Sequence, residues 1–190
     1  MNLTYPVLEL GDVRLEPLSE GHRDALRAAA NADQEIWDIY PFSMANEHFD
    51  GYWTKTMQSK ADETLAPYAV LLEGKVVGGS AYFARDPANS AVEIGGSYYR
   101  PEVRGTHVNP SAKLLLLGHA FACGAKRVGF RVDAVNARSR AAVTKLGAKQ
   151  EGILRQDRVT WTGRVRDTVI FSVLAEEWPD VEHGLLARLG

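Results

Sequence analysis

The sequence predicts an α/β (α+β) protein in which helices cover both faces of one mixed sheet. Two observations carry this prediction. The first half of the chain has the alternating apolar pattern of strands joined by a tight hairpin, and the second half runs strand, helix, strand. The two kinds of connection together indicate a mixed sheet whose apolar faces are buried under helices. The 190 residues, 45% of them hydrophobic, suffice for one domain spanning 1–190.

Three local signals define the elements of the first half. Ser19 is a good N-cap for the first helix, because its side-chain oxygen can accept a free N–H. In the second helix, aromatic residues recur every three or four positions, a stripe more typical of core than of a ligand site. Glu73-Gly74 permits the positive φ of a tight hairpin turn. The predicted elements are a strand at 13–18, helices at 19–30 and 45–60, and hairpin strands at 68–72 and 75–78.

The second half opens with a strand that leads into an unusual turn. An apolar helix follows this turn, and strands and helices then alternate up to a final hairpin at Thr162-Gly163. Trp178-Pro179 begins a tail that is expected to carry a short helix. The predicted elements are strand 91–99, turn 104–110, helix 110–121, strand 128–133, helix 136–146, and strands 151–159 and 166–174.

Composition argues against secretion and membrane insertion. The single cysteine, Cys123, cannot form an intramolecular disulfide or a thiolate metal cage, so we expect it to be a small core or helix residue. No apolar run reaches the length of about 18 residues that a membrane helix needs. The start of the chain lacks the basic and apolar regions of a secretion signal. We therefore expect a cytoplasmic protein without a membrane partner.

Several familiar chemical motifs are absent. The chain has no Walker phosphate loop and no G-x-G-x-x-G after a strand. The segment Gly95–Tyr99 departs from a nucleophile elbow at its last position. The five histidines lack the spacing of metal ligands, so no metal site is predicted.

Charge is strongly segregated along the chain, although the net charge is only −2. Residues 1–99 hold seven Lys and Arg against 15 Asp and Glu, whereas residues 100–166 hold 14 against four. This pattern favours an anionic ligand near the middle segment and a cationic one near the first half. Charges that intermix on a folded surface explain the same counts. The basic residues follow no single face, which argues against a nucleic-acid partner.

The turn before the apolar helix has the features of an anion site. Asn109 is a candidate N-cap, and Pro110 suits the first helical position, where an N–H would lack a partner. Gly105 lets the preceding backbone bend. Free N–H groups and the helix dipole would then point at one place, suited to a pyrophosphate, with Arg100 and Arg104 adding positive charge. A merely well-capped helix is the alternative.

At this point the sequence resembles a family. Arg104–Asn109 is similar to the Q/R-x-x-G-x-G/A acetyl-CoA loop of the GNAT N-acetyltransferases. Val132–Ala148, followed by Glu151–Arg155, strongly resembles the RimJ/RimL-type branch, which includes ribosomal-protein-alanine N-acetyltransferases. The strand at Arg166–Val169 and the following Glu177-Trp178 match as well. The likeness covers most of the chain and is strongest from about 90 to 178.

The resemblance implies the GNAT fold, a twisted and mainly antiparallel sheet with a splay between two central strands. It also implies acetyl-CoA as cosubstrate and no metal. The pantetheine arm would pair with the strand that ends at Tyr98-Tyr99. Asn136 matches an amide contact to the cofactor, and its position also suits a helix N-cap. The residues expected to bind the cofactor are Tyr98, Tyr99, Arg100, Arg104, Gly105, Thr106, His107, Val108, Asn109, Asn136 and Ser139.

The loop departs from the family pattern at two positions. His107 and Asn109 stand where small residues are usual. Their bulk would narrow the approach to the phosphates, or their side chains would reach a phosphate oxygen. We expect acyl-CoA to bind, because main-chain donors do most of the cradling.

Acyl transfer to an amine needs a base, an oxyanion donor and an acid. The protonated amine must lose a proton before it attacks, and a carboxylate or a water chain can accept it. Glu93 lies where relatives often place a base, and Ser139 is the candidate acid near the thioester sulfur; a solvent-facing strand position and simple cofactor binding are the alternatives. A main-chain N–H beside the splay would stabilise the oxyanion.

The resemblance therefore predicts transfer of an acetyl group to a primary amine by direct attack in a ternary complex. No residue indicates a covalent acyl-enzyme. Trp37, Asp38 and Tyr40 are the candidate acceptor-binding residues, because aromatic rings and a carboxylate suit an amine. The acceptor is expected to be a protein N-terminal α-amine or a small molecule, and the protein a monomer or homodimer. A non-catalytic acyl-CoA-binding module is the alternative from another class.

Overall fold

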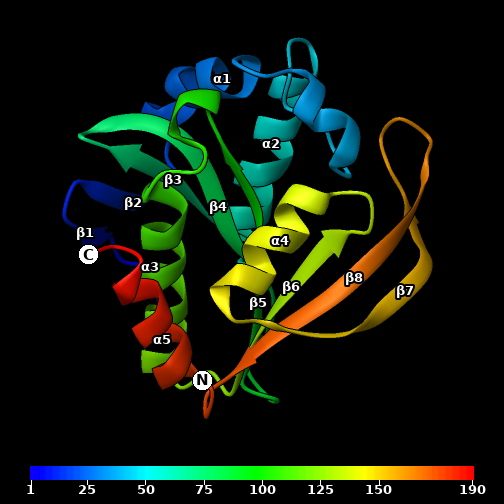
Figure 1. Cartoon of the computed structure of the whole chain (residues 1–190). Coiled ribbons are helices and arrows are strands. Elements are labelled where there is room, and N and C mark those ends of the chain that lie inside the picture. The colour runs from blue at the N-terminus through cyan, green and yellow to red at the C-terminus, as the bar shows by residue number, and fades with distance from the viewer.

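The computed structural model describes residues 1–190 as one eight-stranded sheet surrounded by helices (Figure 1). The strand order is β1-β2-β3-β4-β5-β6-β8-β7, and every neighbouring pair is antiparallel except β5 and β6. The strands are β1 (Leu8–Leu10), β2 (Val13–Pro17), β3 (Ala66–Leu72), β4 (Lys75–Asp86), β5 (Ala91–Tyr99), β6 (Arg127–Asp133), β7 (Lys149–Val159) and β8 (Val165–Leu174). The helices are α1 (Arg23–Asn31), α2 (His48–Ala61), α3 (Val108–Ala122), α4 (Ala137–Leu146) and α5 (Trp178–Ala187), with 3-10 turns η1 (Glu20–His22), η2 (Glu35–Ile39) and η3 (Pro101–Val103).

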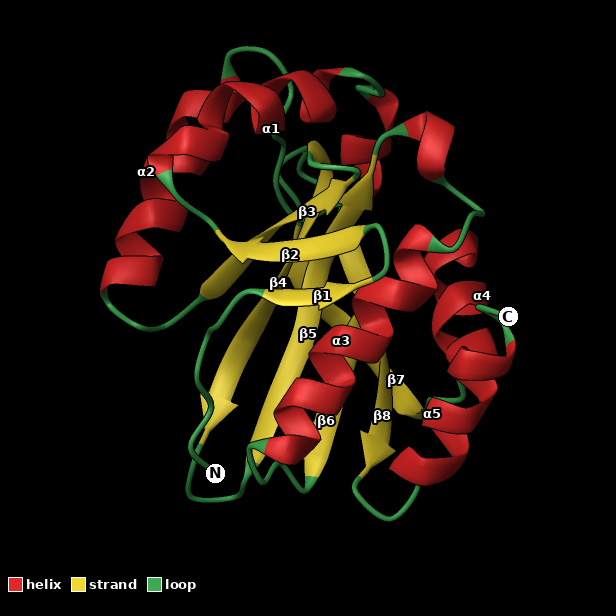
Figure 2. Cartoon of the chain, turned by 90° about the vertical axis from the view of Figure 1, so that its left-hand side faces the viewer, coloured by secondary structure: helices red, strands yellow, loops and turns green.

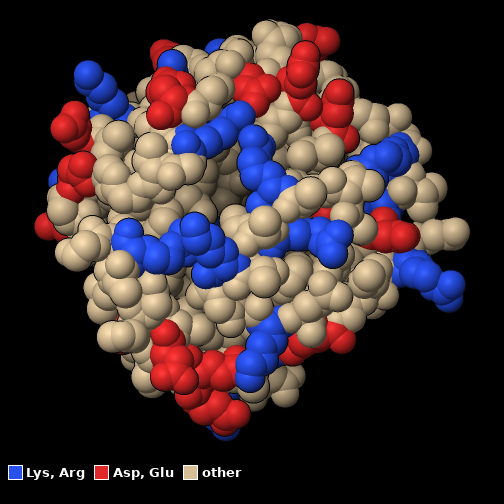
Figure 3. Space-filling model, in the orientation of Figure 1, with Lys and Arg blue, Asp and Glu red and all other residues tan.

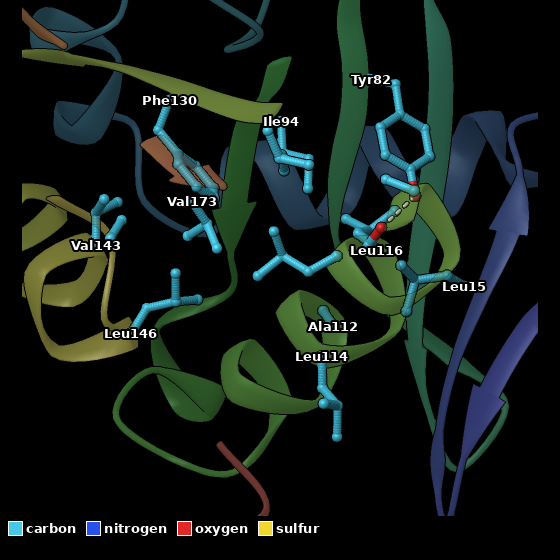
Figure 4. Packing of buried hydrophobic residues seen from close by; sticks show 14 of the residues in the cluster. Leu15, Tyr82, Ile94, Ala112, Leu114, Leu116, Phe130, Val143, Leu146 and Val173 are labelled. Carbon is cyan, nitrogen blue, oxygen red and sulfur yellow. Dashed lines mark hydrogen bonds between the residues drawn. The ribbon is translucent and has the colours of Figure 1, made fainter. Parts of the chain in front are cut away.

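Helices cover both faces of the sheet, as predicted (Figure 2). On one face, α3, α4 and α5 bury the larger hydrophobic cluster, in which Leu116 and Val128 are fully buried. Close packing ties α3 to the strands here, and the Tyr82 hydroxyl donates a hydrogen bond to the Leu116 carbonyl at 2.6 Å (Figure 4). On the other face, α1, α2 and η2 bury a second cluster against β3 and β5. No helix is long and apolar enough to cross a bilayer.

The second cluster contains the predicted aromatic stripe of α2. Phe49 and Trp53 are 0% and 4% exposed, so these rings belong to the core, as the spacing indicates. This cluster covers only the β2–β5 part of the sheet, and no helix lies on the same face of β6, β8 and β7. That uncovered area is instead lined with paired charges, such as Arg131 with Asp157 at 2.8 Å.

The predicted splay lies between β5 and β6. Their parallel pairing joins only Ala91–Glu93 to Arg127–Gly129, although both strands continue well beyond these residues. The departure coincides with an irregularity in the pairing of β5 with β4, where Gly96 has a φ of +60°. A bulge with a glycine in the left-handed region bends a strand, so it allows β5 to turn away from β6.

Three details of the predicted elements are corrected by the structure. The short strand β1 was not predicted, and β4 extends to Asp86 rather than ending near residue 78. The prediction that Asn109 caps α3 is wrong, because the helix begins at Val108 and His107 occupies the N-cap position. The Thr106 hydroxyl accepts the Val108 N–H at 3.3 Å and starts the helix earlier. Pro110 is therefore the third helical residue, where proline is still tolerated.

Candidate functional site

The loop between β5 and α3 offers unpaired main-chain donors. The N–H groups of Gly105, Thr106, His107 and Asn109 form no hydrogen bond within the chain. Gly105 has a φ of +77°, a conformation that favours glycine and turns the backbone into the helix. Free N–H groups together with the positive end of the α3 dipole form a site for an anion such as a pyrophosphate.

The two arginines beside this loop are held by neighbouring acids. The Arg100 guanidinium pairs with Glu102, and Arg104 pairs with Asp33, in both cases at 2.5 Å. Arg104 also donates from its Nε to the Tyr99 carbonyl at 2.8 Å. The arginine beside Asp33 holds the pKa of that carboxyl below its usual value. Their positive charge lies near the loop, but much of their hydrogen-bonding capacity is used inside the protein.

His107 is turned away from the free donors. Its Nε2 lies 2.9 Å from a carboxylate oxygen of Asp12, in the turn between β1 and β2. The Asn109 side chain forms no hydrogen bond, and the space beside Gly105 is open. The bulk of His107 is therefore accommodated against another loop, and the main chain supplies the free donors.

The edge of β5 beyond the splay offers a free main-chain donor to an added strand. The Arg100 N–H donates to the Val77 carbonyl of β4, so strand alternation directs the main-chain groups of Tyr99 away from β4. The Ser97 carbonyl already accepts the Tyr40 hydroxyl at 2.5 Å, and the Tyr99 carbonyl already accepts the arginine described above. No strand lies beside the Tyr99 N–H, since β6 has already diverged. An extended ligand can pair here.

The side chains of Tyr98 and Tyr99 have structural positions. They are 4% and 9% exposed, and neither hydroxyl has a hydrogen-bond partner. Tyr98 packs edge-on against Trp37, with ring centroids 5.0 Å apart. The contribution of these tyrosines to a ligand site is therefore through the main chain.

The start of α4 forms the opposite wall. Asn136 is the N-cap of α4, and its side-chain oxygen accepts the Ser139 N–H at 2.9 Å. The Ser139 hydroxyl forms no hydrogen bond within the chain. Figure 3 shows a hollow between the loop that precedes α3 and helix α4, with Lys and Arg side chains around its rim. The hollow follows the splay, so both helix starts face the same space.

Glu93 lies at the point where the two strands part. It is the last residue of β5 paired with β6, opposite Gly129. Its side chain lies over this glycine, because an added Cβ there would be 3.3 Å from the Glu93 Cγ. The nearest cation, Arg131, is 4.0 Å away, and that arginine is bound to Asp157. Burial raises the pKa of the Glu93 carboxyl above its ordinary value despite the nearby arginines.

The three acceptor candidates occupy different environments. Trp37 is 1% exposed and donates its indole N–H to the Ala30 carbonyl at 3.0 Å, so its ring is part of the core. Asp38 is exposed. Tyr40 reaches across from η2 to β5, and burial raises its pKa to about 12. Trp37 meets β5 through the Tyr98 ring, and Tyr40 is the one of the three that bonds to the main chain of this strand.

Two residues near the site were missed by the sequence analysis. Trp161, at the tip of the β7–β8 hairpin, donates its indole N–H to the Trp37 carbonyl at 2.8 Å and lies against His48. Nothing local predicts this long-range contact. Lys113 is 6% exposed within α3 and bonds to Ser97. Its position inside an otherwise apolar run was a signal that could have found it.

Comparisons with known proteins identify the family. A model described as an acetyltransferase (GNAT) domain matches residues 12–149. The chain belongs to the GNAT family. A GCN5-related N-acetyltransferase from Brucella melitensis is 31% identical, with a TM-score of 0.92 over 100% of this chain and 88% of that one. No curated protein matches the sequence.

Two more distant GNAT structures share the fold. RimJ from Mycobacterium smegmatis, solved with a CoA-disulfide, is 22% identical, with a TM-score of 0.80 over 95% of this chain and 92% of that one. RimL, an alpha-N-acetyltransferase of a ribosomal protein solved with coenzyme A, is 15% identical, with a TM-score of 0.78 over 90% and 99%. The resemblance to RimJ/RimL-type GNAT proteins is thereby confirmed.

The residues of this chain fit the acyl-CoA that the GNAT family uses. Free main-chain donors at the start of α3 match the acceptor oxygens of a pyrophosphate, and the open edge of β5 matches the amide groups of pantetheine. Ser139, whose hydroxyl forms no hydrogen bond within the chain, belongs to the first turn of α4. The protein is accordingly a GNAT acetyltransferase.

Proposed function

We propose that this GNAT protein transfers the acetyl group of acetyl-CoA to a primary amine, by direct attack in a ternary complex. The observation that carries the proposal is the splay itself. It has free main-chain donors on one wall, a free hydroxyl on the other and a partly buried carboxylate at its apex. Such a cleft can bind an extended anionic cosubstrate and deprotonate an amine beside it.

The cofactor-binding roles follow from the unpaired groups. The pyrophosphate is held by the free N–H groups of Gly105, Thr106, His107 and Asn109. The Tyr99 N–H pairs with the pantetheine arm. Asn136 has its side-chain amide nitrogen free for a contact to the same arm, since only its oxygen is used in the helix cap. Arg100 and Arg104 add long-range positive charge.

Glu93 is the proposed general base. An amine acceptor is protonated near neutral pH and must lose a proton before it can attack. A carboxylate whose pKa is raised by burial is a stronger base than an exposed one, and Glu93 lies where β5 and β6 open. Bound acetyl-CoA supplies the activated thioester carbonyl. The departing sulfur can take up the Ser139 hydroxyl proton, and the attacking nitrogen, which loses a second proton as the amide forms, returns one to that oxygen.

The first-choice acceptor is a protein N-terminal α-amine. RimL, which shares the fold, is an alpha-N-acetyltransferase of a ribosomal protein, and this supports the choice by analogy. Asp38 is exposed beside Tyr40, so a carboxylate and an aromatic ring are available for a cationic amine. Trp37 would act only by supporting Tyr40, its neighbour at 5.1 Å between ring centroids. A small-molecule amine is the second candidate acceptor.

Calorimetric titration with acetyl-CoA is the first test, with dephospho-CoA and buffer as controls. One-to-one binding supports the cofactor assignment. A panel of N-terminal peptides and small amines, followed by release of free CoA thiol, then identifies the acceptor. Absence of binding contradicts the proposal. Binding without turnover on any amine would favour a non-catalytic acyl-CoA module.

A further inference from the structure

A lysine is buried directly behind the site. Lys113 of α3 is 6% exposed, and its Nζ donates to the Ser97 hydroxyl at 2.5 Å and to the Ser80 hydroxyl at 3.4 Å. The two serine hydroxyls are 2.7 Å from each other. No carboxylate pairs with this amine. These three residues form a small polar cluster between α3, β4 and β5, which we call the lysine–serine cluster.

Ser97 is held from both faces of the sheet. From the α3 side, Lys113 binds its hydroxyl; from the opposite helical layer, Tyr40 donates to its carbonyl at 2.5 Å. Ser97 directly follows Gly96, the left-handed residue at the bulge where β5 leaves β6. Ser97 is also the only partly exposed member of the cluster, since Ser80 and Lys113 are buried.

We propose that Lys113 is a positioning residue for acyl transfer: through Ser97 it fixes the bulged segment of β5 against which the acyl group is bound. The proposal rests on the proposed function, because it assumes that this segment borders the acyl group. Lys113 itself touches no reacting atom. Its effect reaches the site through one hydroxyl and the main chain that carries it.

The amine does not serve stability. Burying an amine without a counter-ion is unfavourable, and an apolar side chain of similar length would fill the same space. Every polar contact of Lys113 is to the two serines, so its influence is concentrated on β4 and β5. This is the arrangement expected of a group that orients a strand.

The cluster also makes the strand sensitive to pH. Burial lowers the pKa of the Lys113 amine to about 7, so the group loses its charge as the pH rises through neutrality. No charged side chain lies within hydrogen-bonding distance of Lys113, and the buried phenols nearby in the fold include Tyr82 on β4, Tyr99 on β5 and Tyr40 after η2. Burial raises the pKa of all three, so they stay neutral and leave the charge of Lys113 uncompensated. The hydrogen bond between the Lys113 amine and the Ser97 hydroxyl therefore differs below and above pH 7.

The test compares Lys113→Met with Lys126→Met, which replaces an exposed lysine beyond the other end of α3. We expect Lys113→Met to lower kcat about tenfold or more while the acetyl-CoA Kd from calorimetry stays within about threefold. The kcat limb near pH 7 should disappear in Lys113→Met and persist in Lys126→Met. Wild-type kcat and an unchanged pH profile in Lys113→Met overturn the proposal.

A readout independent of activity is NMR titration of lysines labelled with 13C at Cε. The Lys113 signal, assigned by its absence from Lys113→Met, should titrate near pH 7 and shift on addition of coenzyme A. If Lys113→Met does not fold, Ser97→Ala replaces it and should show the same loss of kcat. A Lys113 signal indifferent to coenzyme A, together with wild-type kcat in Ser97→Ala, overturns the proposal.

Failure of the proposed function gives a different result. In that case the wild-type protein neither binds acetyl-CoA nor releases CoA thiol with any amine, and both proposals fall. If only the role of Lys113 is wrong, the wild type turns over and the variants match it.

Discussion

Helices α3 and α4 both begin at the splay, yet their first turns are built in opposite ways. At α4, the side chain of Asn136 accepts the Ser139 N–H and closes the cap. At α3, no side-chain cap serves the first turn beyond the long bond from Val108 to Thr106, and four preceding or early N–H groups stay free. Unpaired donors at a helix start are costly unless water or a ligand satisfies them. The difference supports the proposal that the start of α3 binds an anion and that the start of α4 presents side chains.

The largest effect is expected at Glu93, between the two helix starts. Glu93→Gln keeps the shape but removes the base, so kcat/KM should fall about a hundredfold or more. In the wild type, the rate should decrease as the pH falls through the raised pKa, because the protonated carboxyl cannot accept a proton. In the variant this limb should flatten.

Steady-state pH profiles with one amine acceptor check this expectation. Glu9→Gln, at an exposed carboxylate of β1, serves as the matched control. If Glu93→Gln keeps the wild-type pH–rate profile, the base is water or another carboxylate.

Gly105→Val tests the anion site proposed at the start of α3. A Cβ here meets no atom within 4 Å, so the substitution causes strain at φ +77° without a clash. Strain of about 1–3 kcal/mol would move the free N–H groups and weaken acetyl-CoA binding by roughly ten- to a hundredfold. Gly74→Val, at φ +76° in an equally open turn, is the control. Calorimetry that finds both variants equal in Kd would contradict the anion site.

Two substitutions of Asn136 test whether this residue only caps α4 or also binds acetyl-CoA. Asn136→Ala removes the cap and the amide, so it should lower the free energy of unfolding by about 1 kcal/mol without unfolding the protein, and should weaken acetyl-CoA binding several-fold. Asn136→Asp retains a capping oxygen but not the amide donor. Stability from thermal melts should recover in Asn136→Asp while affinity does not. Unchanged affinity in both variants would leave Asn136 as a cap alone.

The smallest effect is expected at Trp161, far from both helix starts along the chain. Trp161→Phe retains a ring beside His48 but removes the hydrogen bond to the Trp37 carbonyl. The loss should be about 1 kcal/mol of stability, with a few-fold rise in the KM of the acceptor. The Kd of acetyl-CoA should not change, and a change equal to that of the acceptor KM would argue against a separate effect of Trp161 on acceptor binding.

Features that depend on residues close together in the chain were predicted from the sequence. The Glu73-Gly74 turn, the strand up to Tyr99 and the alternative of a cap at Asn136 all depend on residues close in the chain, and the structure agrees with each. The start of α3 was misplaced because Thr106 competes with Asn109 for the early N–H groups. Asn109 keeps its place in the proposed site only through its main chain.

Long-range contacts explain most of what the sequence analysis could not predict. Trp37 was expected to bind the acceptor, but its indole N–H bonds to Ala30 and its ring is enclosed by residues brought together by folding. The partners of Lys113 and Trp161 lie on other elements, and spacing within the chain cannot reveal them. The splay was predicted from the resemblance to GNAT proteins, because the periodicity of hydrophobic residues alone does not indicate it.

The docking of the β7–β8 hairpin tip has a consequence for protein synthesis. Trp161 and Trp37 are separated by 124 residues, and β8 inserts between β6 and β7 in the sheet. The ribosome delivers β7 before β8, so β7 has no edge to join until β8 has also emerged. A nascent chain can thus complete the start of α3 long before Trp161 reaches Trp37 beside the proposed acceptor site. The acceptor side of the proposed site is therefore completed only after β8 has been synthesised.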